Sequence, residues 1–380
     1  MTKKDKDPVL VVLQLSGGND YFNTVIPYTD PNYHDSRRTL GIPEDEVLRL
    51  DDELGFHPAM GPMKEMYDGG NVAIVHGVGY ENSSRSHFRS MDIWHTCEPV
   101  KAGTEGWIGR TIRDLDPRGE SPVTAVNIGV GLPKAVVAPG VSVASVADLA
   151  TYGFLGQDQW QQQRAEMLDR FARMYGPATG TGPVMEYVGQ SGLDALNGAD
   201  ILKEAAAGYS SEVEYANDKI ARSLRDVATI HTSGVGTRIF YTQHGGFDTH
   251  AGQAAAHPQL WSEVSGAVRD FWDDLRAHDA DENVIMLLFS EFGRRVKDNG
   301  SGTDHGSAGV SFVVGPRVKG GMYGAYPDTD AGALDQGDLV PNQDFRGVYS
   351  TILQEWLGLD PVPIVNGQFE QPQFVEKIAG

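Results

Sequence analysis

The sequence predicts an α/β fold, with a mainly parallel central sheet and helices on both of its faces. Three observations support this. Short apolar runs recur along the chain, most of them end in glycine and polar residues, and an amphipathic helical pattern separates two of them. Buried parallel strands have this apolar character because helices cover both faces of their sheet. Strands that alternate with helices in this way are typical of α/β proteins.

The first strand is expected at Val9 to Leu15, a mostly apolar run rich in β-branched residues that ends abruptly in the turn Ser16-Gly17-Gly18-Asn19-Asp20. This pattern is typical of a buried parallel strand that leads into a turn. Similar short runs predict five more strands, at 72–75, 123–128, 237–242, 284–289 and 311–314.

A helix is expected between the strands at 237–242 and 284–289. Apolar residues recur there at spacings of three and four, with charged residues between them: Leu260, Val264, Val268, Phe271 and Leu275. This spacing places the apolar side chains on one side of an amphipathic helix. The helix therefore crosses over between two strands of the sheet.

The length of 380 residues fits one large domain with an insertion. We expect the insertion, or cap, at about 143–234 and expect it to shape the substrate entrance. It contains a helical, Gln-rich stretch from Gln157 to Tyr175, a Gly/Thr/Pro cluster from Gly176 to Pro183, and a second helical stretch through Val227. Both domain and insertion are predictions from pattern alone.

Composition and charge exclude several classes of function. The chain is 40% hydrophobic and 22% charged, as in ordinary globular proteins. Its formal net charge of -21 disfavours nucleic acid as a partner, because such binding relies on clustered Lys and Arg. The single cysteine, Cys97, excludes an intrachain disulfide and a zinc site built on several thiolates. A metal must therefore be held by oxygen and imidazole nitrogen.

The amino-terminal residues MTKKDKDP are charged and lead directly into the first strand, with neither an apolar signal region nor a small-residue cleavage site. No stretch approaches the roughly 18 apolar residues of a membrane helix. We therefore expect no membrane span and a cytoplasmic location for the chain as written. A leader missing from this sequence would instead make the protein periplasmic or exported.

Polar residues that follow the predicted strands are the main site candidates, because ligands of open α/β sheets bind beyond the carboxyl ends of the strands. Asp20 comes after a Gly-Gly turn, where its carboxylate and the amide oxygen of Asn23 suit a hard cation. The alternative is a turn and helix cap, in which Asp and Asn are common.

Two further segments pair an acid with an imidazole. Asp248 and His250 offer one oxygen and one nitrogen ligand to a metal, or His250 serves as a general acid or base. The alternative is a helix cap at Thr249. Asp304 and His305 lie between glycines and are a second such pair, with a solvated turn as the alternative.

Glu291 follows the apolar run 285–289 closely, so an unpaired carboxylate there would be costly to desolvate. A metal ion or Arg294 must compensate its charge. The first reading makes Glu291 a metal ligand, and the second makes it one half of a structural ion pair.

A fifth segment, Asn82 to Phe88, precedes a predicted helix. The hydroxyls of Ser84 and Ser86 beside Arg85 suit an oxyanion at a helix amino terminus, and a metal would activate one serine as the nucleophile. An ordinary serine cap is the alternative at equal odds.

Taken together, these segments resemble the domain of unknown function 1501 family, part of the alkaline-phosphatase-like superfamily of phosphatases, arylsulfatases and phosphomutases. The resemblance runs through most of the chain and is weak only at about 143–234. It rests on the segments 17–28, 56–58, 84–88, 106–110, 248–250, 290–294, 303–306 and 344–346.

The resemblance implies roles for individual residues. Asp20 corresponds to the first metal ligand, Asp248 and His250 to the middle Asp and His motif, and His305 to the late His. Glu291 stands where an Asp usually precedes a His or Asn.

Two positions depart from the superfamily pattern. Phe292 replaces a His ligand of the phosphatases, which favours a single metal held mainly by Asp20 and Glu291, as in sulfatases. Glu81 falls where sulfatases carry their modified Cys, which leaves Ser84 and Ser86 as the candidate nucleophiles. Calcium, magnesium or manganese suits such oxygen-rich coordination, and zinc is the remaining choice.

The sequence therefore predicts a divalent-metal-dependent hydrolase of phosphate or sulfate esters, with a small-molecule or carbohydrate ester as the substrate. The metal and Arg85 would balance the charge on the transferred group. The alternative is a catalytically inert scaffold that binds a sulfated or phosphorylated ligand, because fold does not fix function.

Overall fold

The computed structural model describes residues 7–149, 170, 173 and 197–376. Within these residues nine strands form one sheet, in the order β11-β5-β10-β9-β1-β8-β6-β7, with β12 also paired to β5. Their bounds are β1 Val9–Leu15, β5 Val72–Gly79, β6 Ala125–Ile128, β7 Ala144–Val146, β8 Ile239–His244, β9 Val284–Phe289, β10 Gly309–Val314, β11 Gly321–Tyr323 and β12 Gln343–Asp344.

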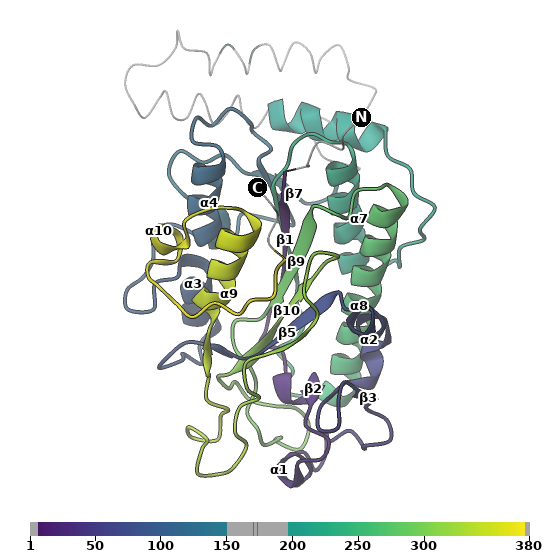
Figure 1. Cartoon of the computed structure of the whole chain (residues 1–380), viewed down its shortest axis with the longest axis vertical. Coiled ribbons are helices and arrows are strands. Elements are labelled where there is room, and N and C mark those ends of the chain that lie inside the picture. Colours follow the sequence, from purple (N-terminus) through teal and green to yellow (C-terminus); the bar gives the residue numbers. More distant parts are fainter. Residues whose placement is uncertain (1–6, 150–169, 171–172, 174–196, 377–380) are drawn as a thin grey trace.

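The predicted fold class is confirmed, because the sheet is mostly parallel and helices cover both of its faces (Figure 1). Each of the six predicted strands has a counterpart, and β1 and β9 occupy the predicted residues. β8 begins and ends two residues later than predicted, and β5 continues four residues further. The one unexpected feature is β10, which runs antiparallel to both β9 and β5.

Two layers of helices enclose the sheet (Figure 1). One layer consists of α2 (Gly61–Asp68), α7 (Lys219–Thr232) and α8 (Gln253–Ala277), and the other of α3 (His87–Thr96), α4 (Trp107–Leu115), α9 (Phe345–Thr351) and α10 (Pro361–Val365). Helix α8 contains the predicted helix and is longer. Since strand side chains alternate between faces, Val11 and Leu13 of β1 join one core, and Leu10 and Val12 join the other.

Shorter elements complete the described fold. Helix α1 (Pro31–Ser36) follows β1, and a small antiparallel sheet joins β2 (Val25–Ile26), β4 (Gly55–Phe56) and β3 (Leu48–Arg49). Single 3-10 turns lie at Tyr21–Asn23, Pro58–Met60 and Lys134–Val136, and a π-helical turn at Ile352–Trp356 continues α9.

The predicted insertion at about 143–234 is described only at its two ends. There, β7 pairs with β6 at the edge of the sheet, and α7 packs against α8 and contributes Leu224 and Val227 to the core. Apart from Arg170 and Arg173, the stretches from Gln157 to Tyr175 and from Gly176 to Pro183 lie outside the described residues. Insertion and substrate entrance therefore stay predictions.

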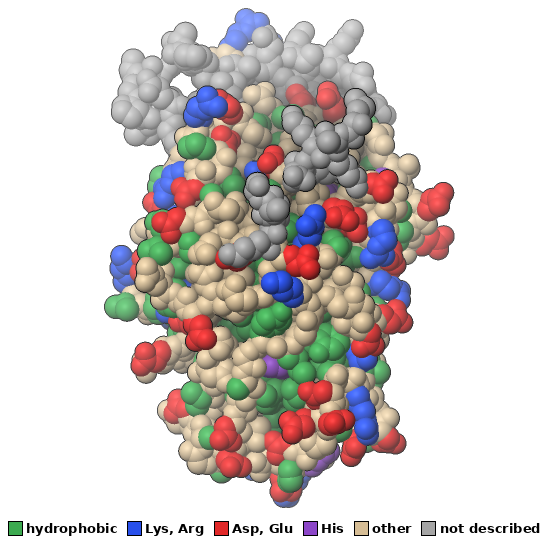
Figure 2. All heavy atoms as spheres, viewed as in Figure 1, with side chains coloured by type: hydrophobic (Ala, Val, Ile, Leu, Met, Phe, Trp, Pro, Cys, Tyr) green, Lys and Arg blue, Asp and Glu red, His purple; other side chains and the backbone are tan. Residues whose placement is uncertain are grey.

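None of the described helices is long and apolar enough to cross a membrane. On the face drawn in Figure 2, Lys and Arg side chains lie scattered among Asp and Glu instead of gathering in one patch. The expectation that nucleic acid is not a partner stays a prediction.

Candidate metal centre

The candidate site lies at one edge of the sheet, where several chain segments meet. β1, β5, β8 and β9 run in the same direction, so the segments that follow them emerge at the same edge. Because β10 is antiparallel, its amino end lies at this edge too, and the loop that precedes it brings His305 there. This is the edge at which open α/β sheets bind ligands.

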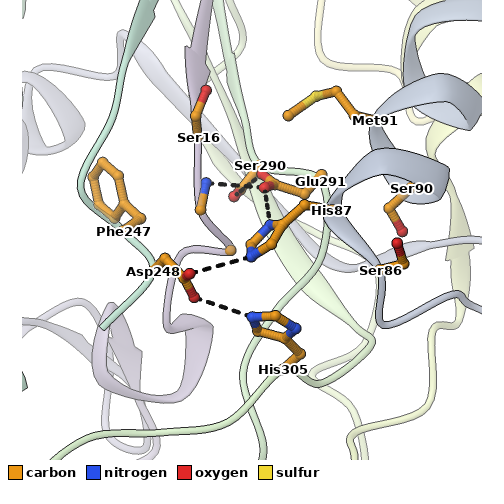
Figure 3. A network of polar contacts seen from close by, with 12 residues as sticks. Ser16, Ser86, His87, Ser90, Met91, Phe247, Asp248, Ser290, Glu291 and His305 are labelled. Carbon is orange, nitrogen blue, oxygen red and sulfur yellow. Dashed lines mark hydrogen bonds and ion pairs between the residues drawn. The ribbon is translucent and has the colours of Figure 1, made fainter. Parts of the chain in front are cut away.

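Three side chains meet at this edge in a geometry that suits a metal ion. His87, Asp248 and His305 each bring one ligand atom into a group whose members all lie within 4.8 Å of one another. Asp248 Oδ1 lies 3.0 Å from His305 Nε2, and Asp248 Oδ2 lies 3.4 Å from His87 Nε2 (Figure 3).

His250 adds a third nitrogen beside this group. Its Nε2 lies 2.9 Å from His305 Nε2 and 3.1 Å from Asp248 Oδ1. The four polar contacts therefore span 2.9 to 3.4 Å. Two ligands of a tetrahedral metal with bonds near 2.1 Å lie about 3.4 Å apart, so the observed spacing is close to that of a coordination sphere.

Each of the three histidines is held by its other ring nitrogen. His87 Nδ1 donates to Glu291 Oε1 at 2.8 Å, and His250 Nδ1 donates to Asp304 Oδ1 at 3.1 Å. His305 Nδ1 donates to the carbonyl oxygen of Arg85 at 2.8 Å. These contacts place the ring proton on Nδ1 and leave the lone pair on Nε2, as in most metal-binding histidines.

This donor set fits a bound cation. Three imidazole lone pairs and a carboxylate would repel one another with nothing between them, and His87 Nε2 is buried with no hydrogen-bond partner. A shared proton or a metal ion removes that repulsion. Two or three imidazoles with one carboxylate form a ligand set of the zinc type, and Mn²⁺ also accepts it.

The electrostatics of the group favour an ionised carboxylate. Burial raises the pKa of Asp248, but the hydrogen bond from Arg294 and the contact with His305 outweigh it and hold that pKa at about 2. The hydrogen bond that His87 donates to Glu291 raises the pKa of His87, against the opposite effect of burial. Asp248 is therefore charged at neutral pH, and it attracts a cation.

Glycines and one arginine shape the loops that hold the group. Gly17 and Gly18 have φ angles of +123° and +80°, and a Cβ on Gly17 would lie 2.4 Å from the backbone nitrogen of Asp248. Only glycine permits this approach. Arg294 has a fully buried side chain that donates to the carbonyls of Gly18 and Thr303 and to Asp248 Oδ1, at 2.7, 2.9 and 2.7 Å respectively.

Asp20 and Asn23, expected as oxygen ligands, lie elsewhere. Both oxygens of Asp20 contact Arg37, at 2.5 and 2.8 Å, and one also accepts from Gln253. Asn23 donates to the Leu40 carbonyl and accepts from Tyr33. Arg37 thus neutralises Asp20, so the structure does not favour a ligand role for either residue.

Glu291 and Asp304, also expected as ligands, contact the Nδ1 atoms of the histidines instead. Glu291 accepts hydrogen bonds from His87, from the backbone nitrogen of Gly17 at 2.9 Å and from Ser290. Arg294, the alternative partner expected for Glu291, pairs with Asp248 instead. Asp304 likewise accepts a hydrogen bond from an imidazole, that of His250. Both acids thus orient imidazoles.

Phe292, which stands in place of a second histidine ligand, packs against the group. It is buried, and its ring centre lies 4.9 Å from the ring centres of both His87 and His305. It adds an apolar wall beside the two imidazoles.

The segment proposed to hold the nucleophile provides His87 instead. Ser86 is the first residue before α3, and its side chain makes no capping hydrogen bond. In Figure 3 the Ser86 hydroxyl lies on the side of Ser90 and not on that of Asp248. Ser84 Oγ accepts from the Ser86 backbone nitrogen at 3.2 Å. The nucleophile role of Ser84 and Ser86 stays a prediction.

Arg85 does not face the group with its guanidinium. That guanidinium binds Asp338, at 2.7 Å, and Gln336. Its backbone carbonyl is the part that contacts the site, through His305.

His87 was not identified from the sequence. It lies in the Ser-Arg-Ser-His-Phe segment, where the hydroxyls and the arginine suggested oxyanion binding. One signal pointed to it: it follows β5, in the position where polar residues of parallel sheets line the ligand site.

One comparison with known proteins shows the family. A family model described as "Protein of unknown function (DUF1501)" matches residues 7–373. A comparison with curated proteins gave no match.

Several solved structures are similar in fold at low identity. A sulfatase from Pseudoalteromonas sp. is 12% identical, with a TM-score of 0.40, and the match covers 99% of this chain and 71% of that one. A lipoteichoic acid synthase from Listeria monocytogenes is 7% identical, with a TM-score of 0.36, and the match covers 90% and 77%. A protein in the alkaline phosphatase superfamily from Vibrio parahaemolyticus is 9% identical, with a TM-score of 0.34, and the match covers 86% and 65%.

Proposed function

The chain belongs to the DUF1501 family, and we propose that it is a metal-dependent hydrolase of phosphate or sulfate esters that uses a single divalent ion. The observation that carries the proposal is the convergence of His87, Asp248 and His305 at the carboxyl edge of the sheet, with His87 Nε2 buried and without a hydrogen bond among the described residues. These three residues would hold the ion.

Zinc is the proposed ion, and manganese is the second choice. Calcium and magnesium prefer oxygen ligands, whereas two of the three proposed ligands are imidazoles. A bound divalent ion would supply charge to balance an ester anion and its transition state.

The other residues of the group have proposed roles in orientation and proton transfer. His250 has a half-exposed side chain, more exposed than those of His87 and His305, so it faces the solvent side from which a substrate would enter. Asp304 accepts from its Nδ1–H, which leaves the lone pair of Nε2, beside His305 and Asp248, to accept a proton. Glu291 and Arg294 fix His87 and Asp248 in place.

The attacking group is proposed to be water. Among the described residues, the hydroxyls of Ser84 and Ser86 make no hydrogen bond to His87, Asp248 or His305.

The test combines metal analysis with turnover. Purified protein is dialysed against zinc or manganese and analysed for bound metal, and the loaded protein is assayed with an aryl phosphate and an aryl sulfate. We expect one ion per chain and hydrolysis of at least one ester. His250→Ala should keep the metal and lose turnover, whereas His305→Ala should lose both.

Two outcomes would overturn the proposal. If wild-type protein bound no divalent metal, the site would not be a metal centre. If it bound one ion and hydrolysed neither ester, while a sulfated or phosphorylated ligand raised its thermal stability, the inert binding scaffold would replace the hydrolase.

A further inference from the structure

A cavity of about 370 Å³ lies beside the candidate metal centre, between the segment 79–85 and the segments that contain Ser307 and residues 335–344. This volume is at the lower end of the range for ligand pockets and suits a group of about the size of one sugar ring. Most of its wall is polar, with Asn82, Ser83, Arg85 and Asn342 among the lining residues.

The cavity adjoins the metal centre through residues of its lining. The segment 79–85 leads directly to His87, and Ser307 is two residues from His305. Arg85 joins the two sites most closely: its carbonyl accepts from His305 Nδ1, while its side chain lines the cavity. A substrate with its ester at His305 would therefore place its adjoining part in this cavity.

The charges of the cavity wall are unbalanced. Asp338 is buried and pairs with Arg85 at 2.7 Å and Arg295 at 3.6 Å, and Asp344 pairs with Arg346 at 2.7 Å. The remaining two carboxylates of the wall, Glu81 and Asp335, are exposed and form no salt bridge among the described residues.

Four carboxylates thus meet three guanidinium groups, and the carboxylates left without a partner are the accessible ones. Among the described residues, Arg85 is the only basic residue in the lining, and it is already bound to Asp338. An anionic group in the cavity would meet two free carboxylates and no free cation of the wall. A positively charged group would satisfy both carboxylates.

We propose that this cavity binds the alcohol part of the substrate and selects an ester whose alcohol part carries an ammonium group, through Glu81 and Asp335. The inference rests on the proposed ester hydrolysis for the role of the neighbouring site. The charge preference of the cavity itself rests on its lining alone and can be tested separately.

The first experiment measures binding without turnover. Glucosamine, glucose and glucuronate have similar size, and at about pH 6 they carry a positive, zero and negative charge respectively. Their binding to the full, metal-free chain is measured by ligand-observed NMR. We expect glucosamine to bind most tightly and glucuronate most weakly, and we expect salt to reduce the difference.

Glu81→Gln/Asp335→Asn is the test variant. Each lost carboxylate should weaken glucosamine binding by about twofold to fivefold, the range of exposed ion pairs, and leave glucose binding unchanged. Asp45→Asn/Glu46→Gln is the matched control, because it removes two exposed carboxylates from another loop and should preserve the ranking. Equal binding of the three sugars, no binding, or an unchanged ranking in the test variant would overturn the proposal.

A second experiment separates this inference from the proposed function. The metal-loaded protein is assayed with the 6-phosphate esters of glucosamine and glucose, and with 6-phosphogluconate. Preferred hydrolysis of the first supports both proposals. Selective binding of glucosamine without hydrolysis of any ester would leave the cavity assignment in place and overturn the hydrolase. Hydrolysis with no preference for the ammonium ester would support the hydrolase and overturn the cavity assignment.

Discussion

At the scale of single residues, the metal centre depends on how each imidazole is oriented. His87 has its Nδ1 bound to Glu291 and its Nε2 directed at Asp248 (Figure 3). Because the carboxylate fixes both the ring orientation and the position of the proton, Glu291 should raise metal affinity without contacting the metal.

Substitution of these two residues should therefore weaken metal binding to different extents. Glu291→Gln keeps an acceptor for His87 but loses its charge, so we expect metal affinity to fall by about 10- to 100-fold. His87→Ala removes a ligand and should cause a larger loss. Equilibrium dialysis with zinc measures both. His34→Ala, at an exposed position on α1, is the control and should bind as wild type does. Equal affinity of His87→Ala and wild type would exclude His87 from the metal centre.

Buried histidines away from the metal centre should make the protein sensitive to acid. Burial lowers the pKa of His76 and that of His95 from 6.5 to about 4. Protonation therefore favours the unfolded chain. Each histidine contributes stability that is complete above pH 6.5 and decreases as the pH falls towards 4, by roughly 3 kcal/mol in total per histidine.

His76→Gln isolates one of these contributions. Its amide oxygen can still accept from Tyr21, whose hydroxyl lies 2.8 Å from His76 Nδ1. The free energy of unfolding of the metal-free proteins is measured in urea at about pH 6.5 and 5. Between these two pH values it should fall by about 2 kcal/mol less in His76→Gln than in wild type. His34→Gln should show the wild-type loss. A pH dependence that His76→Gln leaves intact would mean that His76 is already protonated in the folded protein.

Single residues also show what could be predicted from the sequence. Asp248, His250 and His305 were identifiable because each follows or precedes a clear apolar strand next to glycines. Asp20 met the same criterion, but its partner Arg37 lies 17 residues away with no periodic relation to it, so the ion pair left no pattern in the sequence.

At the scale of elements, strand positions were predictable and strand directions were not. An apolar run such as Val310 to Val314 indicates burial on both faces, which a strand has in either direction. The antiparallel direction of β10 follows from its pairing with β9 and β5. That direction brings His305 to the metal centre, so the site depends on a feature that the sequence pattern left open.

Helix α1 is tied to the end of β1 by the buried pair of Asp20 and Arg37, whose side chains are fully inaccessible. Removal of one partner leaves the other charge buried. Arg37→Met should therefore lower the free energy of unfolding by about 3 to 5 kcal/mol, and the double variant Arg37→Met/Asp20→Asn should lose less. Urea unfolding measures both.

The exposed pair of Arg49 and Glu44 supplies the control for this prediction. Both side chains are more than half exposed, so Arg49→Ala should cost no more than about 1 kcal/mol. If Arg37→Met lowered the free energy of unfolding as little as Arg49→Ala does, Asp20 and Arg37 would not form a buried ion pair. The role of Asp20 as a metal ligand would then be open again.

At the scale of the whole molecule, the metal centre joins segments that are distant in sequence. His87 begins α3, Asp248 follows β8, and His305 precedes β10. The last two are separated from His87 by more than 150 residues. The folded sheet brings them together, so the unfolded chain has no comparable site, and a metal that binds here should stabilise the fold as a whole.

Metal addition should therefore raise the thermal stability of the protein. Free zinc at about 100 times its Kd should add about 2.7 kcal/mol to the free energy of unfolding. Calorimetry should show the matching rise in Tm, and EDTA should reverse it. Hydrogen exchange should slow at 85–88, 246–250 and 303–306, and stay unchanged at α10, which contributes no ligand. His305→Ala should show neither effect. A rise in Tm that persisted in His305→Ala would place the bound metal elsewhere in the chain.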